Sequence, residues 1–173
     1  MKKIMKMFAI SMMVAIMSVV AVNAQSKGDM AVGGNLAIGM GDDITNFGIG
    51  GKFQYNVIDP LRLEGSLTFF LPKSYGYGDN YKLSMWNFDM NAHYLFPVAN
   101  QVTIYPLGGL GVQGWKSKIK GNGSHSDTDL VINFGGGVDI KLTNQLVLNG
   151  ELKYRVGSDF DRFIISAGIA YKF

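Results

Sequence analysis

From about residue 29 to residue 173, apolar side chains alternate with polar or small side chains at nearly every second position. Successive side chains of a β-strand point to opposite faces of its sheet, so this alternation predicts strands with one apolar and one polar face. No stretch after Ala24 shows the apolar spacing of an amphipathic helix. The alternation therefore predicts an all-β chain that forms one domain without a linker.

Eight segments carry the alternation, and each reaches the roughly 9–11 residues that a tilted strand needs to cross a bilayer. They are residues 29–40, 46–57, 61–71, 82–96, 102–115, 128–142, 145–156 and 163–173. Tight links follow the second, fourth and sixth segments, at residues 58–60, 97–101 and 143–144. The other links are longer, polar and rich in glycine, at residues 41–45, 72–81, 116–127 and 157–162. Short turns at one rim and longer loops at the other are typical of membrane barrels, whose short turns face the periplasm.

The side on which the apolar faces lie separates a soluble ligand-binding barrel from a membrane barrel. The apolar faces carry no charged residue across their middles, as contact with lipid demands. Aromatic side chains that fit membrane-interface belts occur toward the segment ends, at Tyr55, Trp86, Tyr94, Tyr105, Tyr154 and Tyr171. Within lipid a sheet must also close on itself to pair all of its backbone groups. We therefore predict an eight-stranded antiparallel up-and-down transmembrane β-barrel with its apolar faces outward.

The polar faces then converge inside, and an eight-stranded barrel is just wide enough for side chains to fill it. Ten charged or titratable residues are predicted to lie there: Lys52, Arg62, Glu64, Asp89, His93, Asp139, Lys141, Glu151, Lys153 and Arg155. Four of them are acids and five are bases, with His93 as the remainder. This near balance predicts an internal salt-bridge network that plugs the lumen.

Residues 1–24 have the three parts of a secretory signal peptide. Lys2, Lys3 and Lys6 precede an apolar run at residues 7–22, which is shorter than the roughly 20 residues of a spanning helix. Small residues at the end of this region predict cleavage after Ala24. We expect residues 1–24 to be a signal peptide and residues 25–173 to be the barrel domain.

The net charge of +3 belongs to this signal segment. Without its three lysines, the 13 acidic residues are matched by as many basic ones. A neutral chain of this kind has no electrostatic footprint for nucleic acid. With no cysteine and two distant histidines, the sequence predicts neither a cofactor nor a metal site.

The signal segment, the eight alternating strands and the terminal run Ile169-Ala170-Tyr171-Lys172-Phe173 resemble the small outer-membrane β-barrels of Gram-negative bacteria. That family includes OmpX, the transmembrane domain of OmpA and opacity-type proteins, and the resemblance covers essentially all of residues 25–173. It implies a location in the outer membrane, in contact with lipid and lipopolysaccharide. It also implies that Phe173, Tyr171 and Ile169 form the signal that the barrel-assembly machinery recognises.

Three functions fit these expectations. The favoured one is a non-enzymatic barrel that supports the envelope, or that binds a surface partner through loop Lys116–Asp127, which also contains Lys118 and Lys120. The second is a barrel enzyme that modifies lipid A or phospholipid, and the third and weakest is a small-solute porin.

Two histidines are the candidates for an enzyme. His125 lies between Ser124 and Asp127, but neighbours in sequence do not make a catalytic triad, which requires convergence in space. His93 lies on a polar face, with Ser84 and Asp89 on the same strand. The sequence His93-Tyr94-Leu95-Phe96 lacks the serine of the His-x-Ser-Asn motif found in lipid A deacylase barrels. We therefore expect His93 to be a hydrogen-bonded interior residue, and no catalytic site.

Overall fold

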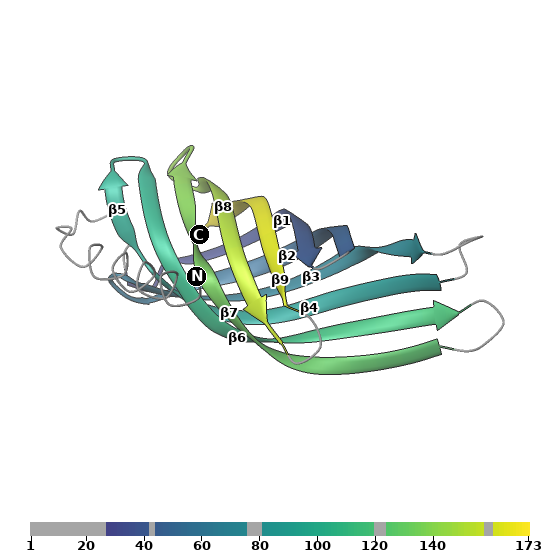
Figure 1. Ribbon diagram of the computed structural model, residues 1–173. Helices are drawn as coiled ribbons and strands as arrows, with labels where there is room; N and C mark the ends of the chain where they lie inside the picture. Colours follow the sequence, from purple (N-terminus) through teal and green to yellow (C-terminus); the bar gives the residue numbers. More distant parts are fainter. Residues whose placement is uncertain (1–26, 42–43, 76–80, 120–123, 158–160) are drawn as a thin grey trace, which may run out of the picture.

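The computed structural model describes residues 27–41, 44–75, 81–119, 124–157 and 161–173. The predicted signal peptide, residues 1–24, lies outside these described residues. Among them, no helix is long and apolar enough to cross a membrane. The strands wind around a common axis and are antiparallel to their neighbours (Figure 1).

Nine strand segments make up the sheet. They are β1 (Met30–Gly41), β2 (Ile44–Ile58), β3 (Leu61–Tyr75), β4 (Tyr81–Tyr94), β5 (Phe96–Ala99), β6 (Val102–Ile119), β7 (Ser124–Lys141), β8 (Leu146–Val156) and β9 (Arg162–Lys172). Both β4 and β5 pair with β6, and only Leu95 separates them. They therefore form one interrupted barrel strand, and the barrel has the eight predicted strands.

Two pairings close the sheet into a barrel. At one seam β4 pairs with β6, and at the other the first strand β1 pairs with the last strand β9. A hydrogen bond from the residue after β9 extends this second seam: the Phe173 N–H donates to the Met30 carbonyl at 3.0 Å. Lys172 Nζ also lies 2.9 Å from Asp29 Oδ2. The predicted fold class, an eight-stranded antiparallel up-and-down barrel, is confirmed.

The links differ from the predicted ones mainly at the long-loop rim. The predicted loop at residues 116–127 is largely a hairpin, because β6 continues to Ile119 and β7 begins at Ser124. Likewise β3 extends to Tyr75, into the loop predicted at 72–81. In β3, β6 and β7 the backbone hydrogen bonds between strands continue beyond the predicted segments. There the alternation of apolar and polar side chains no longer marks a strand. The expected loops are therefore shorter than predicted and are carried on strand extensions.

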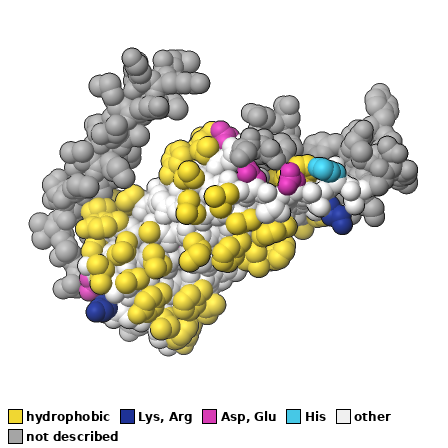
Figure 2. Space-filling view, turned by 90° about the horizontal axis from the view of Figure 1, so that it is seen from below, with side chains coloured by type: hydrophobic (Ala, Val, Ile, Leu, Met, Phe, Trp, Pro, Cys, Tyr) yellow, Lys and Arg dark blue, Asp and Glu magenta, His cyan; other side chains and the backbone are white. Residues whose placement is uncertain are grey.

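The apolar faces lie outside the barrel. Leu36, Ile49, Phe69 and Trp86 are paired across β1 to β4 in one continuous row, and all four are exposed. Hydrophobic side chains spread over the middle of the visible face, and charged side chains lie toward its ends (Figure 2). A surface of this kind matches lipid and would be costly in water.

Tyr105 is the exception among the predicted belt residues. It is only 2% exposed and lies inside the barrel, so its assignment to the membrane interface is wrong. Tyr105 follows the exposed Ile104 in β6, and the alternation of that strand points it inward. Its place near a strand end suggested a belt residue, but the strand's alternation decides the face.

The interior is layered along the barrel axis. Near the long-loop rim Ala37, Phe70, Met85 and Ile164 form a buried apolar cluster. Near the short-turn rim Leu95, Tyr105 and Leu107 form a second one. Buried charged side chains fill the rest of the lumen, with Arg162 against Phe70 of the first cluster and Arg62 against Tyr105 of the second.

Candidate functional site

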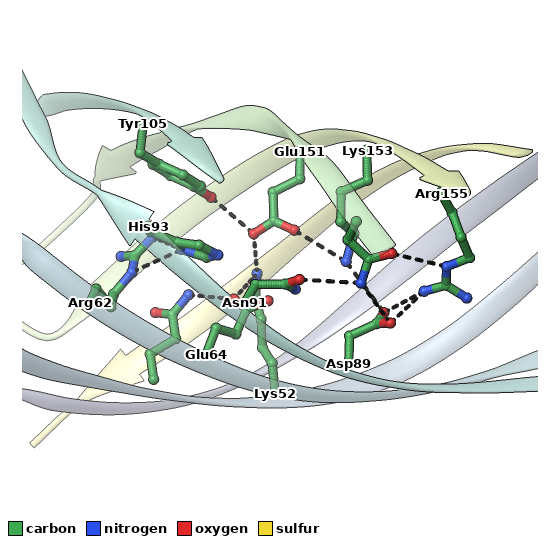
Figure 3. Close-up of polar contacts among 12 residues, drawn as sticks. Lys52, Arg62, Glu64, Asp89, Asn91, His93, Tyr105, Glu151, Lys153 and Arg155 are labelled. Carbon is green, nitrogen blue, oxygen red and sulfur yellow. Dashed lines mark hydrogen bonds and ion pairs between the residues drawn. The ribbon is translucent and has the colours of Figure 1, made fainter. Parts of the chain in front are cut away.

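The centre of the lumen is built around Lys52, which β2 directs inward. Its Nζ lies 3.4 Å from Glu64 Oε2 on β3 and 3.3 Å from Glu151 Oε1 on β8. Gln54 Nε2 donates to Glu64 at 2.8 Å, and the Tyr105 hydroxyl donates to Glu151 at 2.9 Å. These residues converge from four strands, as Figure 3 shows, so a single ammonium group links opposite walls of the barrel.

A second cluster surrounds Asp89 of β4, which lies on the long-loop side of Lys52. Arg155 Nη2 donates to both carboxylate oxygens of Asp89, at 2.5 and 2.6 Å. Asn133 Nδ2 donates to Asp89 at 2.9 Å, and Arg155 Nε donates in turn to Asn133 Oδ1 at 3.1 Å. Lys153 Nζ lies 3.7 Å from Asp89 and 3.8 Å from Glu151, so it connects this cluster to the central one (Figure 3).

A third cluster lies toward the short-turn rim, around Arg62 of β3. Its Nη1 is 2.5 Å from Asp139 Oδ2, and its Nε lies 3.2 Å from His93 Nδ1, to which it donates. The ring of Tyr105 is stacked on His93 at 4.6 Å and also lies 4.8 Å from the Arg62 guanidinium carbon. His93 is therefore a packed interior residue that accepts a hydrogen bond from an arginine.

Nine of the ten residues that the sequence assigned to the interior are buried and belong to these three clusters. The tenth, Lys141, is exposed, and its predicted interior position is wrong. It is the last residue of β7 and has the same inward register as Asp139. Alternation gives the face of a residue but not its depth, and at the rim the inward face meets solvent.

Sequence reasoning also missed several interior residues, among them Gln113, Tyr105 and Arg162. Gln113 accepts from Arg155 at 3.4 Å, and Tyr105 binds Glu151 as described above. Arg162 is buried near the long-loop rim, where it donates to Asn46 Oδ1 at 3.0 Å and lies 4.4 Å from the ring of Phe70. Arg162 was assigned to a loop, yet it has the same register as the inward Ile164 and Ser166. This alternation was the sequence signal that could have placed Arg162 in the interior.

The lumen contains one set of groups with the composition of a metal site. Ligand atoms of Glu64, His93 and Glu151 all lie within 4.8 Å of one another and are buried. Lys52 Nζ is paired with both of these glutamates, so an ammonium already supplies the positive charge that a metal ion would bring. The two glutamates thus bind the ammonium group of Lys52 in place of a metal ion, and the chemistry of this set is ion pairing.

The candidate catalytic residues are not assembled into a reactive site. Asp89 is engaged by Arg155 and Asn133, and His93 by Arg62 and Tyr105. Ser84 pairs in register with Lys116, at an outward position of β4. His125 is exposed on β7, and its ring lies 5.6 Å from that of Trp115. The hydrogen bonds and ion pairs of Asp89 and His93 therefore join strands of the barrel wall.

Comparison with solved structures identifies the same architecture in several outer-membrane proteins. The N-terminal β-barrel domain of Pseudomonas aeruginosa OprF matches with a TM-score of 0.70 and 16% identity, covering 86% of this chain and 100% of that one. Neisserial surface protein A matches with a TM-score of 0.66 and 16% identity, over 84% and 96% of the two chains. Ail, the attachment invasion locus protein of Yersinia pestis, matches with a TM-score of 0.63 and 18% identity, over 85% and 99%.

These identities establish the fold alone, and among curated proteins none matches the sequence. The family profile described as the outer membrane protein beta-barrel domain matches residues 8–173, which is nearly the whole chain. The outward apolar rows and the enclosed polar lumen agree with that assignment. The chain belongs to the outer membrane protein beta-barrel domain family and is an integral outer-membrane protein.

Proposed function

We propose that this protein is a non-conducting, non-enzymatic barrel that supports the outer membrane and presents the β6–β7 hairpin outside the cell. The observation that carries this proposal is the cross-linked lumen, where Lys52 pairs with Glu151 from β2 to β8 and Lys153 pairs with Asp89 from β8 to β4. An eight-stranded barrel filled in this way has no continuous water path for ions. Its rigidity suits a structural role.

Planar-bilayer recordings of the refolded barrel test the closed lumen. We expect no stable single-channel steps from the wild-type chain. The triple variant Lys52→Ala, Arg62→Ala, Arg155→Ala removes three of the largest filling side chains and serves as the positive control for detecting a pore. Steady conductance from the wild type would contradict the proposal and favour the small-solute porin.

The enzymatic alternative is separated by lipid analysis. Cells that produce the wild type, His93→Ala or His125→Ala are compared by mass spectrometry of lipid A and phospholipids. We expect identical lipid profiles, because neither histidine has a catalytic arrangement around it. A lipid product that depends on either histidine would contradict the non-enzymatic proposal.

The hairpin is the part of the protein best suited to a surface partner. The strands β6 and β7 have 18 residues each and are the longest in the barrel as described. Lys116 is exposed, and the sequence places Lys118 and Lys120 at the next two alternate positions. A structure of Ail with the heparin analogue sucrose octasulfate supplies a precedent for polyanion binding in this fold.

We therefore propose that the hairpin binds polyanions such as the phosphate-bearing part of lipopolysaccharide. Sucrose octasulfate is a suitable probe in calorimetry with the refolded barrel. Binding should weaken with salt and should be lost in Lys116→Glu, Lys118→Glu, Lys120→Glu. Lys141→Glu changes an exposed lysine at the opposite rim and is the matched control. Equal loss in both variants would point to non-specific charge attraction.

Export is proposed to follow the signal at residues 1–24, with the short turns ending in the periplasm. The mass of protein purified from membranes tests cleavage after Ala24. We expect a chain that begins at Gln25, and retention of the leader would contradict this assignment.

A further inference from the structure

Three glycines occupy outward register positions on neighbouring strands. Gly34 of β1 pairs with Gly51 of β2, and Gly51 pairs in turn with Leu67 of β3. Gly65 of β3 pairs with Phe53, one outward position along β2 from Gly51. Most outward positions of β1 to β3 carry large apolar side chains, and at these three positions the strands present backbone instead.

Neither space nor backbone conformation requires glycine at these positions. A Cβ built on Gly65 meets nothing within 4 Å, and on Gly34 or Gly51 it meets only ordinary contacts at 3.6 and 3.8 Å. None of the three has the positive φ that favours glycine. Glycine inside a strand also costs roughly 0.5–1 kcal/mol relative to alanine.

Gly33 and Gly50, which directly precede Gly34 and Gly51, have no room for a side chain. A Cβ on the inward Gly33 would lie 2.5 Å from the Ile169 carbonyl oxygen, and one on Gly50 would lie 2.7 Å from the Leu67 carbonyl oxygen. Packing inside the barrel thus explains Gly33 and Gly50. It does not explain Gly34, Gly51 or Gly65, whose missing side chains face the membrane.

Gly51 and Gly65 line a shallow hollow of about 650 Å³ on the outer surface, and Gly34 lies beside it as the register partner of Gly51. Its walls are large apolar side chains, namely Val32, Ile49, Phe53, Leu67, Phe69 and Phe88. All six are exposed, and the side chain of Lys52, which borders the hollow from the other face of β2, is buried in the lumen. An occupant of this hollow therefore meets apolar side chains at its walls and the backbone of the glycines at its floor.

The position of the hollow along the barrel selects a leaflet. Gly34 and Gly65 are each at the third outward position from the short-turn rim, after Met30 and Val32 on β1 and after Leu61 and Leu63 on β3. Tyr94 pairs with Leu61 and Tyr55 with Leu63, which places an aromatic row just outside the hollow. The lining of the hollow extends from Val32, the second outward position of β1, to Phe69, the fifth of β3. With the short turns in the periplasm, as proposed above, the end of the hollow beside the aromatic row lies in the inner leaflet of the outer membrane, which consists of phospholipid.

We propose that this hollow is a binding site for one acyl chain of an inner-leaflet phospholipid, which exchanges more slowly than the lipid around it. An unfilled hollow would forfeit dispersion contacts with its lining, and a slender flexible chain restores them. A second copy of the barrel fits less well, since a two-fold contact centred here would set the hollow against itself and leave a void.

Substitutions that fill the hollow test this site. Gly51→Leu and Gly65→Leu each place a side chain into the hollow without a backbone clash. Gly108→Leu adds the same side chain at an open position on β6, outside the hollow, and is the matched control. Heat-dependent gel migration verifies that each variant is folded, and failure of one hollow variant to fold leaves the other to decide.

The refolded mature chain is placed in vesicles of phosphatidylethanolamine and phosphatidylglycerol that also contain lipid A. Electron paramagnetic resonance then measures the motionally restricted fraction of a chain-labelled phosphatidylethanolamine, and native mass spectrometry identifies lipid retained after mild detergent extraction. We expect the wild type and Gly108→Leu to show the same restricted fraction and a retained phospholipid. In Gly51→Leu and Gly65→Leu the restricted fraction should fall by the share of one chain per barrel, and the retained phospholipid should be lost.

Three results would overturn the proposal. An unchanged restricted fraction in both hollow variants would show that the hollow holds no particular chain. Retention of lipid A in place of phospholipid, lost in the same variants, would place the hollow in the outer leaflet and would contradict the proposed orientation, while the closed lumen would stand. A wild-type dimer that Gly51→Leu dissociates would identify a second copy as the occupant.

Discussion

Lys52 illustrates how charge is tolerated inside a narrow barrel. Moving an ion from water to a protein interior costs several kcal/mol, and pairing offsets that cost only when the geometry is good. Lys52 has two carboxylates within 3.4 Å, and both receive a further hydrogen bond from Gln54 or Tyr105. Each buried ion in the central cluster therefore depends on its partners: loss of Lys52 takes the cation from Glu64 and leaves Glu151 with Lys153 at 3.8 Å.

At the residue scale, we expect Lys52→Met to lower the free energy of unfolding by about 3–5 kcal/mol, because it leaves two buried carboxylates without their shared cation. Lys141→Met removes the same side chain from an exposed rim position and should change stability by less than about 0.5 kcal/mol. Reversible urea unfolding in phospholipid vesicles measures both values. Similar losses for the two variants would show that the lumen contacts contribute nothing specific.

At the scale of single strands, glycine has two roles that depend on the face it occupies. In β6, Gly109 faces the lumen, and a Cβ there would collide with the carbonyl oxygen of Met90 and with Asn91. Its neighbour Gly108 faces outward, with nothing within 4 Å of a Cβ. One strand thus combines a glycine that the narrow interior requires with one that it does not.

We therefore expect Gly109→Ala to destabilise the barrel by about 1–3 kcal/mol, the usual cost of overpacking a filled interior. Gly108→Ala should be neutral or stabilising by up to about 1 kcal/mol, because alanine loses less conformational freedom on folding. Unfolding free energies of the two variants under the same conditions decide the comparison. A stable Gly109→Ala would indicate that the β4–β6 seam is looser than the contacts around it imply.

The last strand carries the second prediction at this scale. Phe173 follows β9 and is exposed, and its N–H holds the seam to Met30. If its ring is part of the assembly signal, Phe173→Ala should reduce the amount of barrel in the outer membrane of cells while leaving refolding into vesicles nearly unchanged. Phe163→Ala removes another exposed ring, near the other end of β9, and is the control. Equal defects in cells would exclude a special role for the terminal residue.

For the whole molecule, enclosure is the property that links fold and function. The side chains of most ion pairs in the lumen are only a few per cent exposed. Mobile ions screen exposed charges and reach buried pairs much less. The closed barrel therefore isolates its charges from the solution on both sides of the membrane.

Because of this isolation, we expect the free energy of unfolding to change little between low and high salt. Polyanion binding at the hairpin should fall steeply over the same range, since Lys116 is exposed. Urea unfolding and calorimetry at matched ionic strengths compare the two. A stability that falls with added salt would mean that solution enters the lumen.

The sequence alone determined the strand number, the membrane-facing side and most of the lumen residues, because a strand directs its side chains alternately to two faces. Sequence periodicity carries no information on depth or on contacts across the barrel. It therefore placed Lys141 inside although it lies at the rim, and it took the buried Tyr105 for a belt residue.

Only the tertiary structure decided which charges pair, since Lys52 and Glu151 are 99 residues apart and meet through barrel closure. It also brought Gly34, Gly51 and Gly65 together on three strands, through the register of their backbone ladders. Closure and register are set by the packing of the whole chain, and for that reason no local pattern reveals them.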